Sequence, residues 1–219
     1  MTSAEPSLTL AVGSLILGLA ASLLWTVTRF LIVAAHHGSQ ALLFSAGGRR
    51  IKHIEMRPGR SEIVVEGDAS FFALLGGFLG PSLFGLLGAT MLAHRLSPET
   101  VLWTAFILLA IVFFQTKNPF GLVITAIYGT LLFVLARNGS AGVRALSAYS
   151  LVWFLLLGSV IHTVLYSVAG KDAADLRKAT MIPTSLWRAI WWLASMAALI
   201  YGGGVLFGLI DPVFRRAPG

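Results

Sequence analysis

The chain has 219 residues, of which 57% are hydrophobic and only 11% are charged. Because an average soluble domain is about 25% charged, this composition excludes an ordinary soluble domain. It predicts an integral membrane protein with several spans in contact with the lipid bilayer. The chain contains no cysteine, which excludes disulfides, thiolate catalysis and cysteine-ligated metal sites. Its net charge of +7 indicates basic loops against an anionic leaflet, and no nucleic acid is expected as a partner.

The first apolar run extends over residues 8–46, about twice the roughly 20 residues that one crossing needs. We expect a span that is tilted or broken near Arg29 and continues as a helix through two adjacent histidines. The pair Gly47-Gly48 is expected to end this helix. Residues 1–7 contain no basic residue, so no cleavable signal peptide is expected and the run stays in the protein.

A polar segment follows at residues 49–68 and predicts a β-hairpin at the membrane surface. Two strand-like stretches flank Arg57-Pro58-Gly59-Arg60, where Pro and Gly occupy positions typical of a tight turn. The second stretch contains the β-branched residues Ile63, Val64 and Val65. Because an exposed strand edge can pair with an extended peptide, these three residues are candidates for substrate binding. The alternative is that the hairpin only caps the cytoplasmic face.

Five further apolar runs are predicted to cross the membrane, at 71–93, 101–115, 120–136, 146–169 and 186–210. The expected fold is an all-α polytopic membrane protein with six spans, or five if the short run 101–115 is half-buried. The whole chain, 1–219, is expected to form one membrane domain with an interfacial loop or helix at about 170–184. In the run 71–93, Gly77, Gly85 and Gly88 recur at near-helical spacing, which favours close packing of helices.

The distribution of basic residues predicts the orientation of the chain. With six spans and the N-terminus outside, nine Lys and Arg residues fall in inside loops and five fall outside. The excess inside predicts a multi-pass protein of the plasma membrane with both termini outside and the hairpin inside.

Polar residues within membrane helices are costly and are therefore candidates for function. No Asp or Glu lies within a predicted span, which argues against a proton pump and against a small-molecule carrier or channel. The structural alternative for His162 is a hydrogen bond to a neighbouring helix. For Arg188 it is a role as an anchor at the membrane interface. The polar residues within the predicted spans are Arg29, His36, His37, Gln40, Gln115, His162 and Arg188.

The stretch AAHHGSQALL places His36 and Gln40 four residues apart, so both lie on one face of a helix. His37 is turned about 100° away from His36. This is the spacing of H-E-x-x-H, in which two histidines hold zinc and the glutamate acts as the base.

Several motifs in this chain, taken in order, resemble those of the site-2 protease family, the intramembrane zinc metallopeptidases. The resemblance is greatest to the compact bacterial members. It covers about residues 25 to 200, and no single motif carries it alone. The motifs are AAHHGSQALLFSAGGRRIKHIEM with its hairpin, GFLGPSLFG at 77–85, NPFG at 118–121, and the pattern formed by Asp172, Asp175, Thr180, Pro183 and Trp187.

The resemblance implies a zinc cofactor, but the key positions depart from the family pattern. His36 stands at the first zinc ligand. His37 stands at the catalytic position of the general-base glutamate, and Gln40 replaces the second zinc histidine. An amide is a poor zinc ligand, and a zinc site of this type needs three protein ligands and a water.

The third ligand of the larger family members is an aspartate whose position here is Phe120. Asp172 or Asp175 could replace it if their loop folds back to the helix. These residues favour a relative without peptidase activity that binds or regulates a transmembrane client. The alternative is an active metalloprotease with an unusual ligand set, in which His36 is joined by His37 or Gln40 and by one of these aspartates.

Overall fold

A computed structural model describes residues 7–58, 61–67, 70–94, 96–166 and 171–211. Within them the chain is largely helical and has one small antiparallel sheet, as predicted. In chain order the elements are α1 (Leu8–Leu23), α2 (Trp25–Ala46), β1 (Ile51–Met56), β2 (Ser61–Val65), α3 (Phe71–Ala93), α4 (Pro98–Gln115), α5 (Pro119–Asn138), α6 (Ala141–Tyr166), α7 (Lys171–Thr180) and α8 (Thr184–Leu206).

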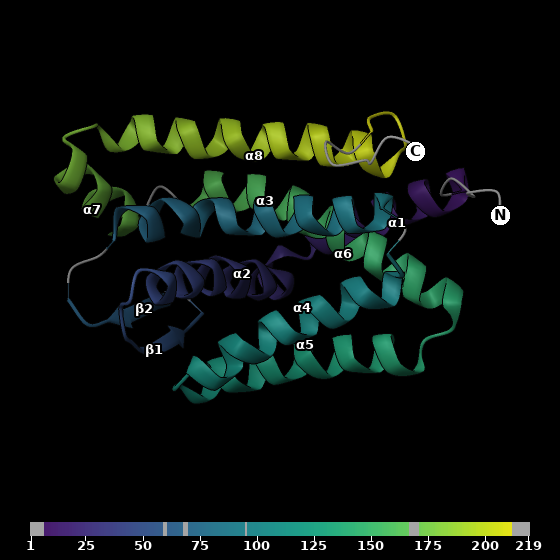
Figure 1. The fold of residues 1–219 in the computed structure, drawn as a ribbon, viewed down its shortest axis with the longest axis horizontal. Helices are drawn as coiled ribbons and strands as arrows, with labels where there is room; N and C mark the ends of the chain where they lie inside the picture. The colour runs from purple at the N-terminus through teal and green to yellow at the C-terminus, as the bar shows by residue number, and fades with distance from the viewer. Residues whose placement is uncertain (1–6, 59–60, 68–69, 95, 167–170, 212–219) are drawn as a thin grey trace, which may run out of the picture.

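Among the described residues, five helices are long and apolar enough to cross a membrane: α3, α4, α5, α6 and α8. The pair α1 and α2 passes the same test together, as one broken span bent by 100°. The chain is therefore a multi-pass membrane protein. The β-hairpin and α7 lie at one end of the helical bundle, and the start of α1 and the end of α8 lie at the other (Figure 1).

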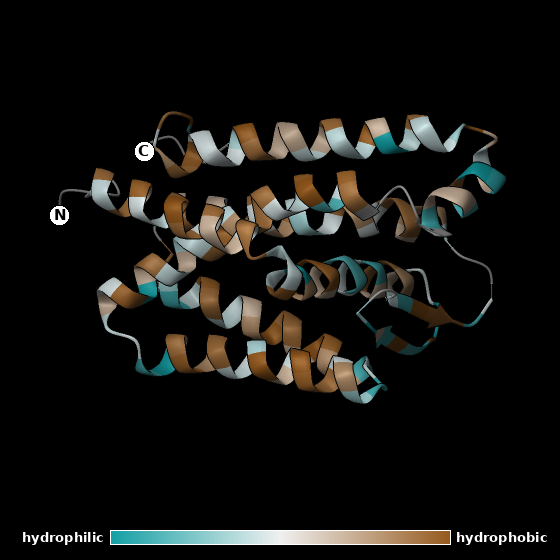
Figure 2. Ribbon diagram, turned by 180° about the vertical axis from the view of Figure 1, so that it is seen from behind, coloured by the Kyte–Doolittle hydropathy of each residue, from teal (hydrophilic) through white to brown (hydrophobic). Residues whose placement is uncertain are grey.

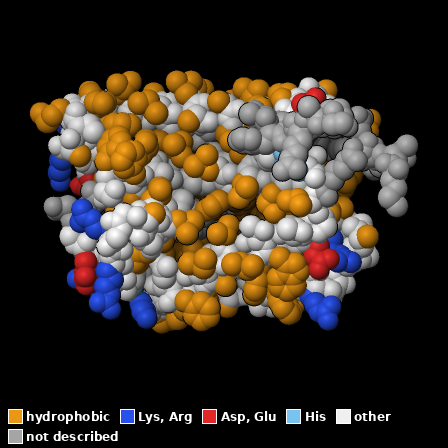
Figure 3. Space-filling view, viewed as in Figure 1, with side chains coloured by type: hydrophobic (Ala, Val, Ile, Leu, Met, Phe, Trp, Pro, Cys, Tyr) orange, Lys and Arg blue, Asp and Glu red, His pale blue; other side chains and the backbone are white. Residues whose placement is uncertain are grey.

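The polar residues follow the same division. Hydrophilic residues gather on the hairpin, on α7 and at helix ends, whereas the long helices are mostly hydrophobic (Figure 2). Charged side chains lie toward the two ends of the face in Figure 3, with hydrophobic side chains between them. A band of apolar surface between polar ends is the arrangement that a bilayer requires of a spanning bundle.

The first apolar run is broken at Leu24, five residues before Arg29, near which a break was expected. Thr28 sits one turn into α2, and its hydroxyl donates to the carbonyl of Ala21 at 2.7 Å. This bond satisfies a carbonyl in the last turn of α1, where helix hydrogen bonds run out. No Pro or Gly marks the break, which is why the sequence did not locate it.

Helix α2 ends where the glycine pair predicts. Gly48 has φ of 70°, a left-handed conformation that glycine adopts without a steric penalty. Arg49 N–H donates to the Phe44 carbonyl at 2.9 Å and Gly48 N–H to the Ser45 carbonyl at 3.0 Å. These two bonds form a Schellman motif, which stops the helix and directs the chain into the hairpin.

The hairpin is held against the bundle through β1. Ile54 and Met56 on β1 are fully buried. Ile54 also pairs with Thr116 after α4, in parallel. The side chain of Asn118 then mimics a strand, because it accepts from Met56 N–H at 2.9 Å and donates to the Met56 carbonyl at 2.6 Å. One edge of the hairpin is thus closed by the segment that joins α4 to α5.

Helices α2 and α3 approach each other closely through glycines on α3. A Cβ added at Gly80 would lie 2.1 Å from Ser39 Oγ, and one added at Gly77 would lie 2.7 Å from Gln40 Nε2. Ser39 also donates to the Gly76 carbonyl at 3.1 Å. Small residues therefore serve helix packing here, as predicted, and they bring α2 against α3 at the level of the polar residues.

Candidate functional site

Three polar side chains of α2 are buried at the centre of the candidate site. His36, His37 and Gln40 are each 5% exposed or less. The ring of His36 meets the ring of His37 edge to face at 5.0 Å between centroids, and that of Phe78 on α3 at 4.8 Å. Buried polar groups are costly unless they are hydrogen-bonded, so the partners of these three decide what the site can do.

Helix α7 supplies the carboxylate that completes the site. Asp172 lies in its first turn and reaches α2, whereas Asp175 points elsewhere and pairs with Lys178 at 3.5 Å. The side chains of Ala173 and Leu176 are buried against Trp187 and its neighbours. This packing fixes the rotation of α7, and the rotation selects Asp172 over Asp175.

Four side chains then form one hydrogen-bonded chain. His37 Nδ1 lies 3.0 Å from Gln40 Oε1, and Gln40 Nε2 donates to Asp172 Oδ2 at 2.9 Å. His36 Nε2 lies 3.3 Å from the same Asp172 oxygen. Three of the predicted site residues are therefore brought together with His37.

The ionisation state of Asp172 decides which of these side chains donate hydrogen bonds and which accept them. Burial raises the pKa of this carboxyl. The hydrogen bond and charge of His36, the charge of His37 and the hydrogen bond from Gln40 lower it by more, so the net effect is a lowered pKa. The carboxylate is therefore ionised at neutral pH and only accepts hydrogen bonds. The Gln40 NH₂ must face it, so Oε1 faces His37, whose Nδ1 must carry a proton. His36 must likewise carry its proton on Nε2.

Two further side chains approach the site from elements that the sequence did not connect to it. His162 on α6 is 4% exposed, and its ring lies 5.2 Å from that of His36. Glu62 on β2 acts electrostatically on His37. No local pattern marks either residue, because each meets α2 only through the packing of distant elements.

Arg29 shares a helical face with His36 but takes no part in the hydrogen-bonded chain. Its guanidinium donates to the Pro58 carbonyl at the hairpin and lies over the ring of Phe30 at 4.9 Å. Arg29 therefore fastens the hairpin to α2.

As they are placed in the structure, these side chains direct hydrogen bonds at one another and do not converge on a metal position. A histidine binds metal through an unprotonated nitrogen, and a ligating carboxylate offers a free lone pair. Here His36 Nε2 carries a proton toward Asp172, and the Gln40 amide donates to the same oxygen. Over the part of the chain that the structure describes, no three His, Cys, Asp or Glu side chains form a group that could hold a metal ion.

The fold and the site define a class: a multi-pass membrane protein in which hydrogen bonds join two buried histidines to a glutamine and an aspartate. Comparison with protein families matches residues 9–202 to the family described as Peptidase M50B-like. The chain belongs to this family, which confirms the resemblance to site-2 proteases. Comparisons with curated proteins and with solved structures give no match.

Proposed function

We propose that this chain is a member of its family without peptidase activity, in which a hydrogen-bonded chain replaces the metal. The observation that supports the proposal is the contact from Gln40 Nε2 to Asp172 Oδ2 at 2.9 Å. A metal peptidase needs lone pairs directed at one point, whereas here N–H donors are directed at the carboxylate. The Gln40 amide and the Asp172 carboxylate satisfy each other, whereas the buried Nδ1 of His36 has no hydrogen-bond partner among the described residues.

The chemistry of position 37 supports the same proposal. A general base in this family removes a proton from a metal-bound water, which requires an acceptor aimed at that water. His37 Nδ1 instead donates to Gln40 Oε1. In this proposal His37 therefore orients Gln40 and does not act as a general base.

Zinc content tests this proposal directly. The chain purified in detergent, without chelators, is expected to contain far less than one zinc per molecule by elemental analysis. His36→Ala is expected to leave that value unchanged, because no ligand is lost. One zinc per chain that disappears in His36→Ala, together with cleavage of a transmembrane substrate, would establish the alternative of an active enzyme with an unusual ligand set.

We further propose that the hairpin binds an extended segment of a transmembrane client. The edge of β1 is closed by Thr116 and Asn118, whereas no strand among the described residues pairs with the other side of β2. Ile63, Val64 and Val65 on β2 are each partly exposed. A strand edge that offers backbone hydrogen bonds and alternating pockets is a known means of binding an extended peptide.

Site-specific photocrosslinking tests the hairpin proposal in the native membrane. A benzophenone amino acid at Val64 is expected to give a discrete adduct with a membrane protein, mapped to residues next to one of its spans. The same amino acid at Lys52, exposed on β1, is the matched control and is expected to give little of that adduct. Equal adducts at the two positions, or adducts with lipid only, would leave β2 as a cap and refute client binding.

The proposed location is the plasma membrane, with the hairpin on the cytoplasmic side and both termini outside. The support is the excess of basic residues on the hairpin side, since Arg and Lys favour the cytoplasmic leaflet.

A further inference from the structure

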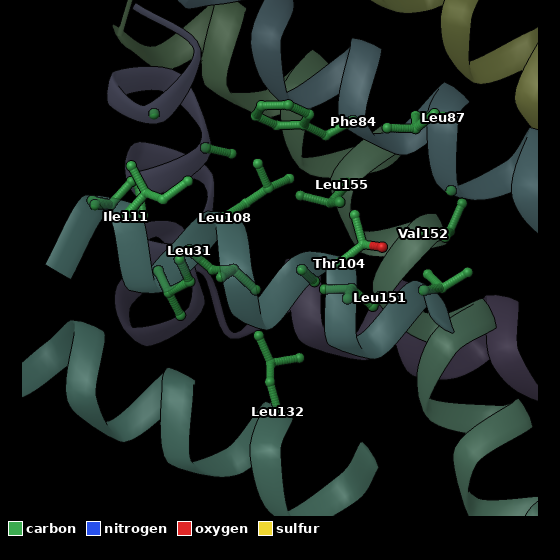
Figure 4. Close-up of a pocket in the computed structure, with 18 of the residues that line it drawn as sticks. Leu31, Phe84, Leu87, Thr104, Leu108, Ile111, Leu132, Leu151, Val152 and Leu155 are labelled. Carbon is green, nitrogen blue, oxygen red and sulfur yellow. The ribbon is translucent and has the colours of Figure 1, made fainter. Parts of the chain in front are cut away.

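An apolar groove lies between α3 and α4, away from the polar site. Its walls are Phe84 and Leu87 on α3 and Leu108 and Ile111 on α4. The floor is formed by α2 and α6, and Figure 4 shows these side chains converging on one space. A hollow lined by hydrophobic side chains also lies in the middle of the face in Figure 3.

The chemistry of the groove excludes a polar ligand. Nearly all of its lining side chains are aliphatic or aromatic. The exception is Thr104, whose hydroxyl already donates to the Thr100 carbonyl at 2.8 Å. A ligand with polar groups would lose its hydrogen bonds to water without replacement, so the occupant must be a hydrocarbon.

The size of the groove selects a thin occupant. The cavity has a volume of about 80 Å³, which is room for several water-sized groups. A helix with its side chains is about 10–12 Å across, so not even one turn of a client helix enters. A single extended chain of methylene groups does.

The groove is also continuous with the surface that faces lipid. Leu87 and Ile111 line it and are 48% and 38% exposed. Next to them, Leu83 and Ile107 are 55% and 56% exposed on the outer faces of α3 and α4. Both helices are candidate membrane spans, so the medium at the mouth of the groove is bilayer hydrocarbon.

We propose that one acyl chain of a membrane lipid occupies this groove as a bound ligand, inserted between α3 and α4. An empty apolar space forfeits the dispersion contacts of its walls, and an acyl chain restores them. The acyl chain would pack against Gly38 and Leu42, which lie on the face of α2 opposite His36, His37 and Gln40. The lipid therefore supports, from behind, the helix that carries the candidate site. This inference is independent of whether the chain cleaves peptides.

Labelling with a phospholipid that carries a diazirine in its acyl chain tests the proposal. The purified chain is reconstituted into vesicles of phosphatidylethanolamine and phosphatidylglycerol with a small fraction of this lipid, irradiated and mapped by mass spectrometry. Adducts at Thr104 and Leu108 are expected to exceed those at Ile107 several-fold. Ala105→Phe, which fills the groove, is expected to remove most of the groove adducts, and Ile107→Phe on the lipid face is the matched control that retains them.

A second filling variant covers the case in which Ala105→Phe fails to fold. Ala35→Phe places the added ring on the α2 side of the groove and is expected to give the same loss. Labelling confined to Ile107 and other outward positions in the unaltered chain would overturn the proposal without any variant. Crosslinked dimers through the groove would also overturn it, because they would identify a second copy of the chain as the occupant.

Discussion

Replacing His37 with Glu and Gln40 with His is expected to create a zinc site. The new histidine would bring an imidazole nitrogen to the place where the Gln40 amide now donates to Asp172. His36 and Asp172 already lie there, 3.3 Å apart. Two histidines and one carboxylate form the usual ligand set of a catalytic zinc, which leaves the fourth position for water. The expected result is about one zinc per chain by elemental analysis.

The controls for this restoration separate the ligands from the base. His37→Glu alone is expected to bind no zinc, because Gln40 still occupies the second ligand position. Adding Asp172→Ala to the double variant is expected to remove most of the bound zinc. A folded double variant that contains no zinc would show that this helix is wrongly aligned with H-E-x-x-H. The roles assigned to positions 36, 37 and 40 would then be wrong.

Gly80→Leu is expected to prevent the close approach of α2 and α3 and to destabilise the protein severely. Even a Cβ at Gly80 would lie 2.1 Å from Ser39 Oγ, 2.5 Å from Ser39 Cβ and 3.2 Å from the Ala35 carbonyl. Overpacking a well-packed core typically costs about 1–3 kcal/mol, and a leucine forced into this space should reach roughly 3 kcal/mol or more. Thermal unfolding in detergent measures the loss.

Gly129→Leu on α5 is the matched control for this substitution. A Cβ there would meet only Phe106, at 4.0 Å, and leucine favours a helix over glycine by roughly 1 kcal/mol. Unfolding of the Gly129 variant is expected at or above the temperature of the unaltered chain. If the two variants unfold alike, the contact between α2 and α3 is looser than these distances state.

Local sequence patterns were sufficient to predict the spans and the hairpin. Hydrophobic length identifies a span because the bilayer fixes how many apolar residues a crossing needs. The turn residues at 57–60 divided the polar segment into two strands, which the structure confirms at 51–56 and 61–65. A break near Arg29 was expected, but its exact position at Leu24 was not predicted, because the compensating bond comes from the hydroxyl of Thr28, a residue type common throughout helices.

The candidate site was less accessible to sequence reasoning because its partners come from distant segments. Helical spacing paired His36 with Gln40, but nothing in the sequence near residues 172 to 175 distinguishes the two aspartates. Their roles depend on which face of α7 packs against Trp187 and its neighbours. His162 could not be assigned to the site from the sequence either, because it reaches the site through the packing of α6 against α3.

The bond between Gln40 and Asp172 joins residues 132 positions apart, and this separation dictates when the site can form. A polypeptide enters the membrane from its N-terminus, so α2 is inserted while the residues that will become α7 are still unmade. Four more spanning helices, α3 to α6, are synthesised after α2 and before Asp172. During this interval His36, His37 and Gln40 have no carboxylate from α7 to bind. Any partner that shields these polar groups in the interval would act on the unfinished protein, and its contacts would end when α7 docks.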